Sequence, residues 1–137
     1  MQHATLGSPR VSRIGLGAMT MAGTYTSGGG LDDAESIRAI HRALDLGVTH
    51  IDTAESYGPF HSEEIVGQAL QGRRDQVVLA TKFGILSHSR DGLFDSTPAN
   101  IRTAVQGSLR RLRTDRIDLY YQHRVDQTPP SRTPSAP

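Results

Sequence analysis

The chain has 137 residues, enough for one domain, with a formal net charge of +1 and 21% charged residues. This balance gives no reason to expect a nucleic-acid partner or an acidic membrane surface, and 5% aromatic residues provide no stacking platform for single strands. Because the sequence has no cysteine, disulfide bonds and thiolate chemistry are excluded.

The first half of the chain predicts a hairpin, a short strand, a helix and a second strand. Residues 6–13 (LGSPRVSR) are typical of a small hairpin, and the apolar residues 14–17 (IGLG) predict a strand. A helix is expected from the N-cap Asp32 to Gly47, which is placed to end it. Residues 48–52 (VTHID) predict the second strand.

The second half repeats this alternation of helix and strand. Residues 62–72 predict a helix with Ser62 as its N-cap, and residues 77–81 (VVLAT) predict a third strand. Residues 96–112 predict a helix that opens with a Ser-Thr cap and a proline in its first turn. Residues 117–121 (IDLYY) predict the fourth strand.

Spacing and charge also predict the surroundings of particular residues in these helices. We expect the buried stripe of the last helix at Ile101, Val105, Leu109 and Leu112. The two glutamates of the 62–72 helix, Glu63 and Glu64, lie in its first turn, where the helix dipole favours them. The pairs Arg73-Arg74 and Arg110-Arg111 are interpreted as solvated helix ends.

Strand–helix alternation with continuous apolar strands predicts a parallel sheet covered by helices. Two α/β architectures fit, the doubly wound open sheet and the (βα)₈ TIM barrel. The stretch GLGAMT at 15–20 lacks the third glycine of a dinucleotide-binding turn, and no helix is predicted to begin there. Gly28–Gly30 is not followed by the Lys-Ser/Thr of a phosphate-binding loop. We interpret both as turns.

Polar residues able to do chemistry follow the later strands. Asp52 ends the second strand, Lys82 follows the third and His123 follows the fourth, while Tyr57 lies five residues after Asp52. In a parallel barrel the carboxyl ends of the strands meet on one face, so these four side chains are candidates for one site. Taken singly, each also has a plain structural interpretation, as a cap, a packed tyrosine, a lysine that reaches solvent, or a core histidine.

The four residues fit a single mechanism. A tyrosine hydroxyl, with an ordinary pKa of ~10, is a poor acid at neutral pH unless a nearby ammonium stabilises the tyrosinate. Lys82, the only lysine in the chain, would supply that ammonium, and the Asp52 carboxylate would keep it charged. His123 would orient a substrate oxygen. A lysine suits this position because it is a compact charge on a flexible stem, unlike the planar arginine.

Several stretches resemble the aldo-keto reductases. They are GLGAM (15–19), HIDTAESYG (50–58), EEIVGQAL (63–70), VVLATKFG (77–84) and SLRRLRTDRIDLYYQHRVD (108–126). The resemblance covers residues 6–126 and implies a (βα)₈ barrel that reduces an aldehyde or ketone to an alcohol with NADPH. It implies Tyr57 as proton donor, with Asp52, Lys82 and His123 completing the catalytic set. The nicotinamide would lie against Gly17, Ala18, Met19 and Asp52.

The resemblance also implies that the barrel here is truncated. A (βα)₈ barrel needs ~250 residues, and this chain predicts about four barrel strands and three helices. In the family, loops of the later strands hold the remainder of the cofactor. We therefore expect residues 1–126 to form the N-terminal half of a barrel with open strand edges, prone to low solubility, a molten state or self-association.

Residues 127–137 (QTPPSRTPSAP) predict a disordered tail, since they hold four of the seven prolines and no apolar pattern. With GC-rich codons chosen for DQTPPSRTPSAP, inserting one base after the codon of Asp126 yields DPDTPIEDTVGA. That sequence is similar to the continuation usual in the family. We hypothesise that this tail is out of frame and carries no function.

Two other functions are alternatives to a reductase. The chain could be a non-catalytic half-barrel fragment that acts only through a binding partner. A metal hydrolase is disfavoured, and no metal is expected, because the histidines are scattered without an H-x-H or HExxH pattern. With no secretory signal pattern and no apolar run near the ~20 residues that cross a bilayer, we expect a cytoplasmic protein without a membrane partner.

Overall fold

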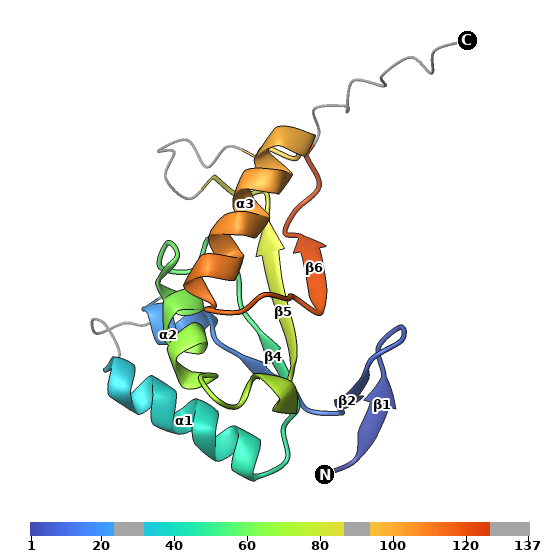
Figure 1. The fold of residues 1–137 in the computed structure, drawn as a ribbon, viewed down its shortest axis with the longest axis vertical. Coiled ribbons are helices and arrows are strands. Elements are labelled where there is room, and N and C mark those ends of the chain that lie inside the picture. The colour runs from blue at the N-terminus through green and yellow to red at the C-terminus, as the bar shows by residue number, and fades with distance from the viewer. Residues whose placement is uncertain (24–31, 87–93, 127–137) are drawn as a thin grey trace.

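The computed structural model describes residues 1–23, 32–86 and 94–126. The predicted tail at 127–137 and the glycines 28–30 lie outside the described residues. The strands are β1 (His3–Thr5), β2 (Arg10–Ser12), β3 (Leu16–Gly17), β4 (His50–Asp52), β5 (Val78–Phe83) and β6 (Leu119–Gln122). The helices are α1 (Asp33–Asp45), α2 (His61–Ala69) and α3 (Pro98–Arg111), with short 3₁₀ turns η1 (Met19–Ala22) and η2 (Arg74–Gln76) (Figure 1).

Strands β3 to β6 form one parallel sheet, as predicted. They lie side by side in sequence order, β3-β4-β5-β6. The doubly wound alternative requires the strand order to reverse at a switch point. Here each strand is added on the same side of the previous one, which is the winding of a barrel. The sheet therefore has the topology of the first part of a (βα)₈ barrel.

The hydrophobic core lies between the three helices and one face of this sheet (Figure 1). Because side chains alternate along a strand, every second residue of β5 faces the helices. The largest fully buried side chains of the core are Ile40, Ile51, Ile65, Leu79 and Leu112. Helix α2 is the central helix, since it packs against both α1 and α3.

The predicted hairpin exists but is shifted towards the N-terminus. Strands β1 and β2 pair antiparallel, and the Leu6 amide donates to the Pro9 carbonyl at 2.9 Å across the turn. Ser12 and Thr49 then join the hairpin to the main sheet, each backbone amide donating to the other's hydroxyl at 2.8 and 2.9 Å. Thr49 immediately precedes β4, so the hairpin covers the amino-terminal end of the strands (Figure 1).

The ends predicted for α1 and the start predicted for α3 are confirmed. The Asp32 carboxylate accepts from the Ala34 amide at 2.9 Å, and Gly47 takes a φ of +90° just after the helix. The Thr97 hydroxyl accepts from the Asn100 amide at 3.3 Å, with Pro98 in the first turn. In both helices, capping signals in the sequence set these boundaries.

The prediction for α2 was wrong at both ends. The helix begins at His61 after Phe60, whose φ is +68°, and it ends at Ala69 rather than at residue 72. Ser62 lies inside the helix and is fully buried. Its hydroxyl donates to the Ala18 carbonyl at 2.9 Å and lies 2.8 Å from the Thr53 hydroxyl. This serine therefore bonds other segments instead of capping its own helix.

The buried stripe of α3 also differs from the prediction. Leu112 is buried as expected, but Ile101, Val105 and Leu109 are only partly buried. The buried positions within the helix are the small residues Ala104, Gly107 and Ser108. The end of α3 approaches α2 closely at another small residue: a Cβ added at Gly67 of α2 would lie 2.3 Å from the Arg111 carbonyl oxygen. Close packing of backbones takes the place of a leucine stripe here.

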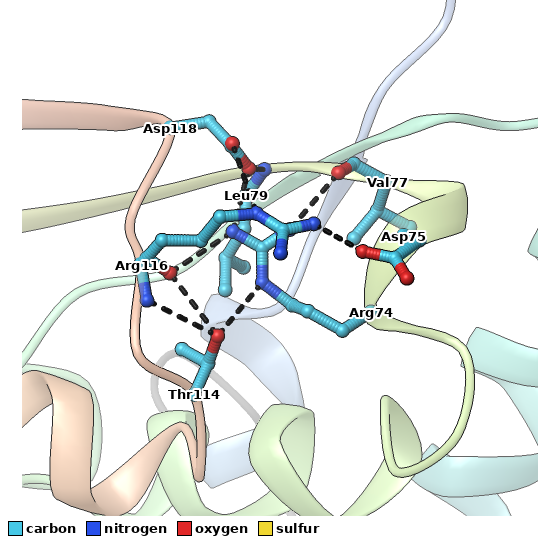
Figure 2. A network of polar contacts seen from close by, with 7 residues as sticks. All are labelled: Arg74, Asp75, Val77, Leu79, Thr114, Arg116 and Asp118. Carbon is cyan, nitrogen blue, oxygen red and sulfur yellow. Dashed lines mark hydrogen bonds and ion pairs between the residues drawn. The ribbon is translucent and has the colours of Figure 1, made fainter.

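Arg73 and Arg74 are not a free, solvated helix end. Arg73 pairs with Asp45 at 2.7 Å, and the Arg74 side chain is only 14% exposed. Arg74 donates to the Asp118 carboxylate at 2.7 Å and to the Thr114 hydroxyl at 3.1 Å (Figure 2). The same carboxylate accepts from the Leu79 amide at 2.8 Å. These contacts fix the register of β6 beside β5 at the amino-terminal end of the sheet.

No helix in the described ranges is long and apolar enough to cross a membrane.

Candidate active site

The carboxyl ends of β4, β5 and β6 bring the predicted residues together. Asp52 is the last residue of β4, Lys82 is the penultimate residue of β5 and His123 directly follows β6. Tyr57 comes from the segment between β4 and α2. The three strands are parallel, so their carboxyl ends lie at the same end of the sheet. This end is opposite the one covered by the hairpin.

Lys82 is the centre of this group. Its Nζ hydrogen-bonds the Asp52 carboxylate, the Thr53 carbonyl at 2.9 Å and the Tyr57 hydroxyl at 3.0 Å. An ammonium has three N–H donors, and each one has an acceptor here. The Lys82 side chain is 16% exposed and that of Asp52 is 32% exposed. An ammonium in this position can donate to a carboxylate and to a phenolic oxygen at the same time.

The segment after β4 places Tyr57 beside Lys82. The Thr53 amide donates to the Ala80 carbonyl at 2.9 Å, and the Glu55 amide donates to the Lys82 carbonyl at 3.2 Å. The chain thus stays attached to β5 for three residues beyond β4. It then turns, with the Tyr57 amide donating to the Ala54 carbonyl at 3.2 Å. The position of the tyrosine is therefore set by backbone bonds to the strand that carries the lysine.

His123 contacts the ring of Tyr57. The two rings meet edge to face with centroids 5.6 Å apart. The His123 amide donates to the Phe83 carbonyl at 2.9 Å, which extends the β5–β6 pairing by one residue. Its Nδ1 lies 3.2 Å from the Ser56 hydroxyl. Burial lowers the pKa of His123, and the positive charges of Lys82 and Arg124 lower it further. The imidazole is therefore neutral at neutral pH.

The residues predicted to touch a nicotinamide lie beside Asp52. Gly17 pairs with Asp52 in the sheet, and the Ala18 amide donates to the Asp52 carbonyl at 2.9 Å. Ala18 is buried, and Met19 begins the turn η1. Gly17 is exposed, and a Cβ added there would meet no atom within 4 Å. The backbone beside Asp52 is thus open to a flat group, which fits one end of a dinucleotide cofactor.

A buried ion pair behind the site was missed by the sequence analysis. Glu63, assigned there to the helix dipole, is fully buried and accepts from Arg111 Nε and from the Thr81 hydroxyl, both at 2.6 Å. Arg111, assigned to a solvated helix end, is 18% exposed and lies over the Phe60 ring at 4.3 Å. One signal was available: Glu63 lies one helical turn before Gly67, on the face of α2 that meets α3.

Arg111 also reaches towards the segment that carries Tyr57. Its guanidinium lies 4.0 Å from the Glu55 carboxylate, and Glu55 accepts from the Gly84 amide at 3.2 Å. Thr81, held by Glu63, is the residue before Lys82. The ion pair therefore supports both the β5 strand end and the β4–α2 segment from the helical side of the sheet.

The described part of the chain contains no group of three or more His, Asp or Glu side chains that could hold a metal ion. Two hollows of about 380 and 140 Å³ lie on the helical side. The larger is lined by charged residues that include Asp33, His61 and Arg110, and the smaller lies between α3 and the end of β5. Neither is lined by Asp52, Tyr57, Lys82 or His123.

The model of the Aldo/keto reductase family matches residues 13–133. The chain belongs to this family. It is 47% identical over 121 residues to the aldo-keto reductase YhdN of Bacillus subtilis, covering 87% of this chain and 36% of that protein. It is 40% identical over 134 residues to the probable aldo-keto reductase 1 of Glycine max, covering 95% of this chain and 38% of that protein.

Solved structures of aldo-keto reductases have the same fold over this span. The holo form of AKR11C1 from Bacillus halodurans matches with a TM-score of 0.76 and 39% identity, covering 88% of this chain and 39% of that one. An aldo-keto reductase from Klebsiella pneumoniae in complex with NADPH matches with a TM-score of 0.70 and 36% identity, covering 85% and 37%. The predicted barrel fold is confirmed. The chain spans 36–38% of the length of the two curated relatives.

Proposed function

We propose that this chain carries the catalytic residues of an NADPH-dependent, cytoplasmic reductase that converts an aldehyde or ketone to an alcohol. The observation that carries the proposal is the contact set of Lys82, whose ammonium joins Asp52 to the Tyr57 hydroxyl. A phenol held by an ammonium, which is itself paired with a carboxylate, is an arrangement suited to proton donation.

In this mechanism the four side chains act on the carbonyl oxygen of a small-molecule substrate. NADPH, when bound, supplies the hydride that reaches the carbonyl carbon. Tyr57 gives its proton to the oxygen, and Lys82 stabilises the tyrosinate that is left, because its Nζ lies 3.0 Å from the phenolic oxygen. Asp52 keeps Lys82 charged. His123, neutral and beside the Tyr57 ring, donates a hydrogen bond that orients the oxygen.

The cofactor assignment rests on the family and on the open backbone at Gly17. Gly17, Ala18, Met19 and Asp52 would hold the nicotinamide end of NADPH. The relatives are longer than this chain, and the Klebsiella pneumoniae relative was crystallised with NADPH. Groups that hold the phosphates would come from outside the residues present here.

The direct test is NADPH oxidation with a panel of aldehydes and ketones. We expect Tyr57→Phe to reduce kcat at least 100-fold, on the order of the contribution of a general acid. Tyr120→Phe is the matched control, because its hydroxyl is buried without a partner among the described residues and its ring stacks on Phe83, on the helical face. Equal activity of the two variants would contradict the role of Tyr57.

A second candidate function is a non-catalytic half-barrel that works through a partner, including another copy of itself. The observation that favours it is the sheet, in which β3 and β6 each pair on one side only within the described residues. Titration with NADPH, followed by tyrosine fluorescence, separates the two functions. Saturable quenching supports the reductase, whereas no response together with no turnover supports the binding fragment.

A further inference from the structure

The Ser56 hydroxyl is within hydrogen-bond distance of the imidazole of His123. The hydroxyl oxygen lies 3.2 Å from Nδ1, across 67 residues of sequence. Ser56 stands between Glu55, whose amide is bonded to the Lys82 carbonyl, and Tyr57. Both partners of the contact are thus fixed by the backbone, because the His123 amide is bonded to the Phe83 carbonyl. The contact follows from the same strand ends that assemble the rest of the site.

A neutral imidazole carries one proton, on either Nδ1 or Nε2, and the partner of one nitrogen decides which. Burial and the charges of Lys82 and Arg124 disfavour the doubly protonated ring, with Asp52 acting weakly in the opposite direction. Among the described residues, the hydrogen bond of the His123 ring is the one between Nδ1 and Ser56, and none is found at Nε2. To donate to a substrate oxygen, the neutral ring must keep its proton on this nitrogen.

We propose that the Ser56 hydroxyl donates to Nδ1 of His123 and thereby holds the proton on Nε2, facing the substrate. Ser56 is then a positioning residue, acting through His123 and not on the substrate itself. The inference deepens the proposed reductase function and rests on it for its catalytic meaning. The tautomer itself is a property of the chain alone and can be measured without turnover.

The test is ¹⁵N NMR of the imidazole nitrogens in histidine-labelled protein, at a pH above the titration of His123. The His123 signals are assigned with a His123→Gln variant. We expect the wild-type ring to be protonated on Nε2, with Nδ1 showing the shift of an acceptor. In Ser56→Ala we expect the Nδ1–H form to become populated, and in Ser56→Thr, which keeps the hydroxyl, we expect the wild-type pattern.

Ser96→Ala is the matched control. The Ser96 hydroxyl accepts from the Gln122 side chain at 2.8 Å, so this variant perturbs the residue next to His123 without touching the ring. A wild-type ring protonated on Nδ1, or a tautomer unchanged in Ser56→Ala, would overturn the proposal. A change of the same size in Ser96→Ala would also overturn it, since the effect would not be specific to Ser56.

Where turnover is measurable, Ser56→Ala should lower kcat roughly fivefold, the rate equivalent of one neutral hydrogen bond, with little change in KM. Rescue by Ser56→Thr separates this effect from a structural one. Failure of the reductase function would appear as absence of turnover in wild type with the tautomer as expected. Failure of the positioning role would appear as turnover in Ser56→Ala equal to wild type.

Discussion

Two histidines of this chain titrate on opposite sides of the ordinary value of 6.5. The pKa of His61 is raised, mainly by its hydrogen bond with Asp33 at 2.9 Å, and the pKa of His123 is lowered, mainly by burial. We predict that NMR titration will place the two on either side of 6.5. In Asp33→Asn, the His61 titration should move down while that of His123 stays. Two histidines titrating together would contradict both environments.

These shifts act oppositely on stability. His123 binds a proton more readily in the unfolded chain, so its contribution is present above pH 6.5 and is lost as pH falls towards its lowered pKa. His61 binds a proton more readily when folded, so its contribution is present below pH 6.5 and is lost as pH rises through its raised pKa. The His61–Asp33 pair is 40% and 51% exposed, so solvent screening makes its share small.

At this scale the sequence predicted which side chains meet at the strand ends, but not the residues that support them. Asp52, Lys82 and His123 were predictable because each stands at the end of an apolar strand. Ser56 and Glu63 were not predicted, because their partners lie 67 and 48 residues away in the chain. Local sequence patterns do not indicate which polar residues will form a hydrogen bond across such a separation.

Helices α2 and α3 are joined by the buried ion pair of Glu63 and Arg111. Removing one of these two charges should destabilise the fold more than removing a surface charge does. Arg111→Met leaves the fully buried Glu63 carboxylate with only the Thr81 hydroxyl. We predict that the free energy of unfolding falls by about 3 kcal/mol, the usual cost of removing one partner of a buried pair. Denaturant melts would measure it.

The control is the neighbouring exposed arginine. Arg110→Met should change the free energy of unfolding by no more than about 0.5 kcal/mol. The double variant Arg111→Met, Glu63→Met should recover part of the loss, since no unpaired charge stays buried. A double variant less stable than Arg111→Met alone would show that the glutamate contributes mainly through Thr81.

Element ends and element faces differed in how well they could be predicted. Asp32, Gly47 and Thr97 act on backbone groups within four residues, so their capping roles could be derived locally. The start of α2 could not, because Ser62 bonds Ala18 and Thr53 in place of its own helix. The face of α3 could not either, because its buried positions are the small residues Ala104, Gly107 and Ser108, which a hydrophobic stripe does not reveal.

At the scale of the whole molecule, part of the sheet face that turns away from the helices is exposed. Tyr121, which pairs with Lys82 and shares its face, is 38% exposed. In a closed barrel, opposing side chains fill this side. We predict that the 137-residue chain self-associates, with sedimentation showing a mass that rises with concentration. Tyr121→Lys should weaken this association, while Arg102→Lys on the outer face of α3 should leave it unchanged.

A compact monomer that melts cooperatively at all concentrations would contradict that prediction.

The parallel sheet and its strands could be predicted from the sequence, because apolar runs and capping signals are local. Physical arguments from the sequence did not distinguish the barrel from the doubly wound sheet. The two folds differ in the side on which each new strand is added, and no single segment of sequence determines that side. Only the resemblance to a family favoured the barrel.

The reading-frame hypothesis for residues 127–137 makes a prediction about the gene. Restoring one base after the codon of Asp126 should open a frame that encodes further strand–helix units. The nucleotide sequence downstream of codon 120 is the measurement. A gene with no such frame would contradict the hypothesis and favour the half-barrel as the product that acts.

All four candidate catalytic side chains, with the serine that contacts one of them, lie between residues 52 and 123. Their supports lie within the described residues as well. Recombination between genes that joined this chain to a different sequence after residue 123 would therefore keep the proposed catalytic side chains together. A crossover between Lys82 and His123 would instead divide them. On the proposed function, the candidate catalytic set is inherited as one contiguous stretch, while the groups that would hold the phosphates of the cofactor lie outside it.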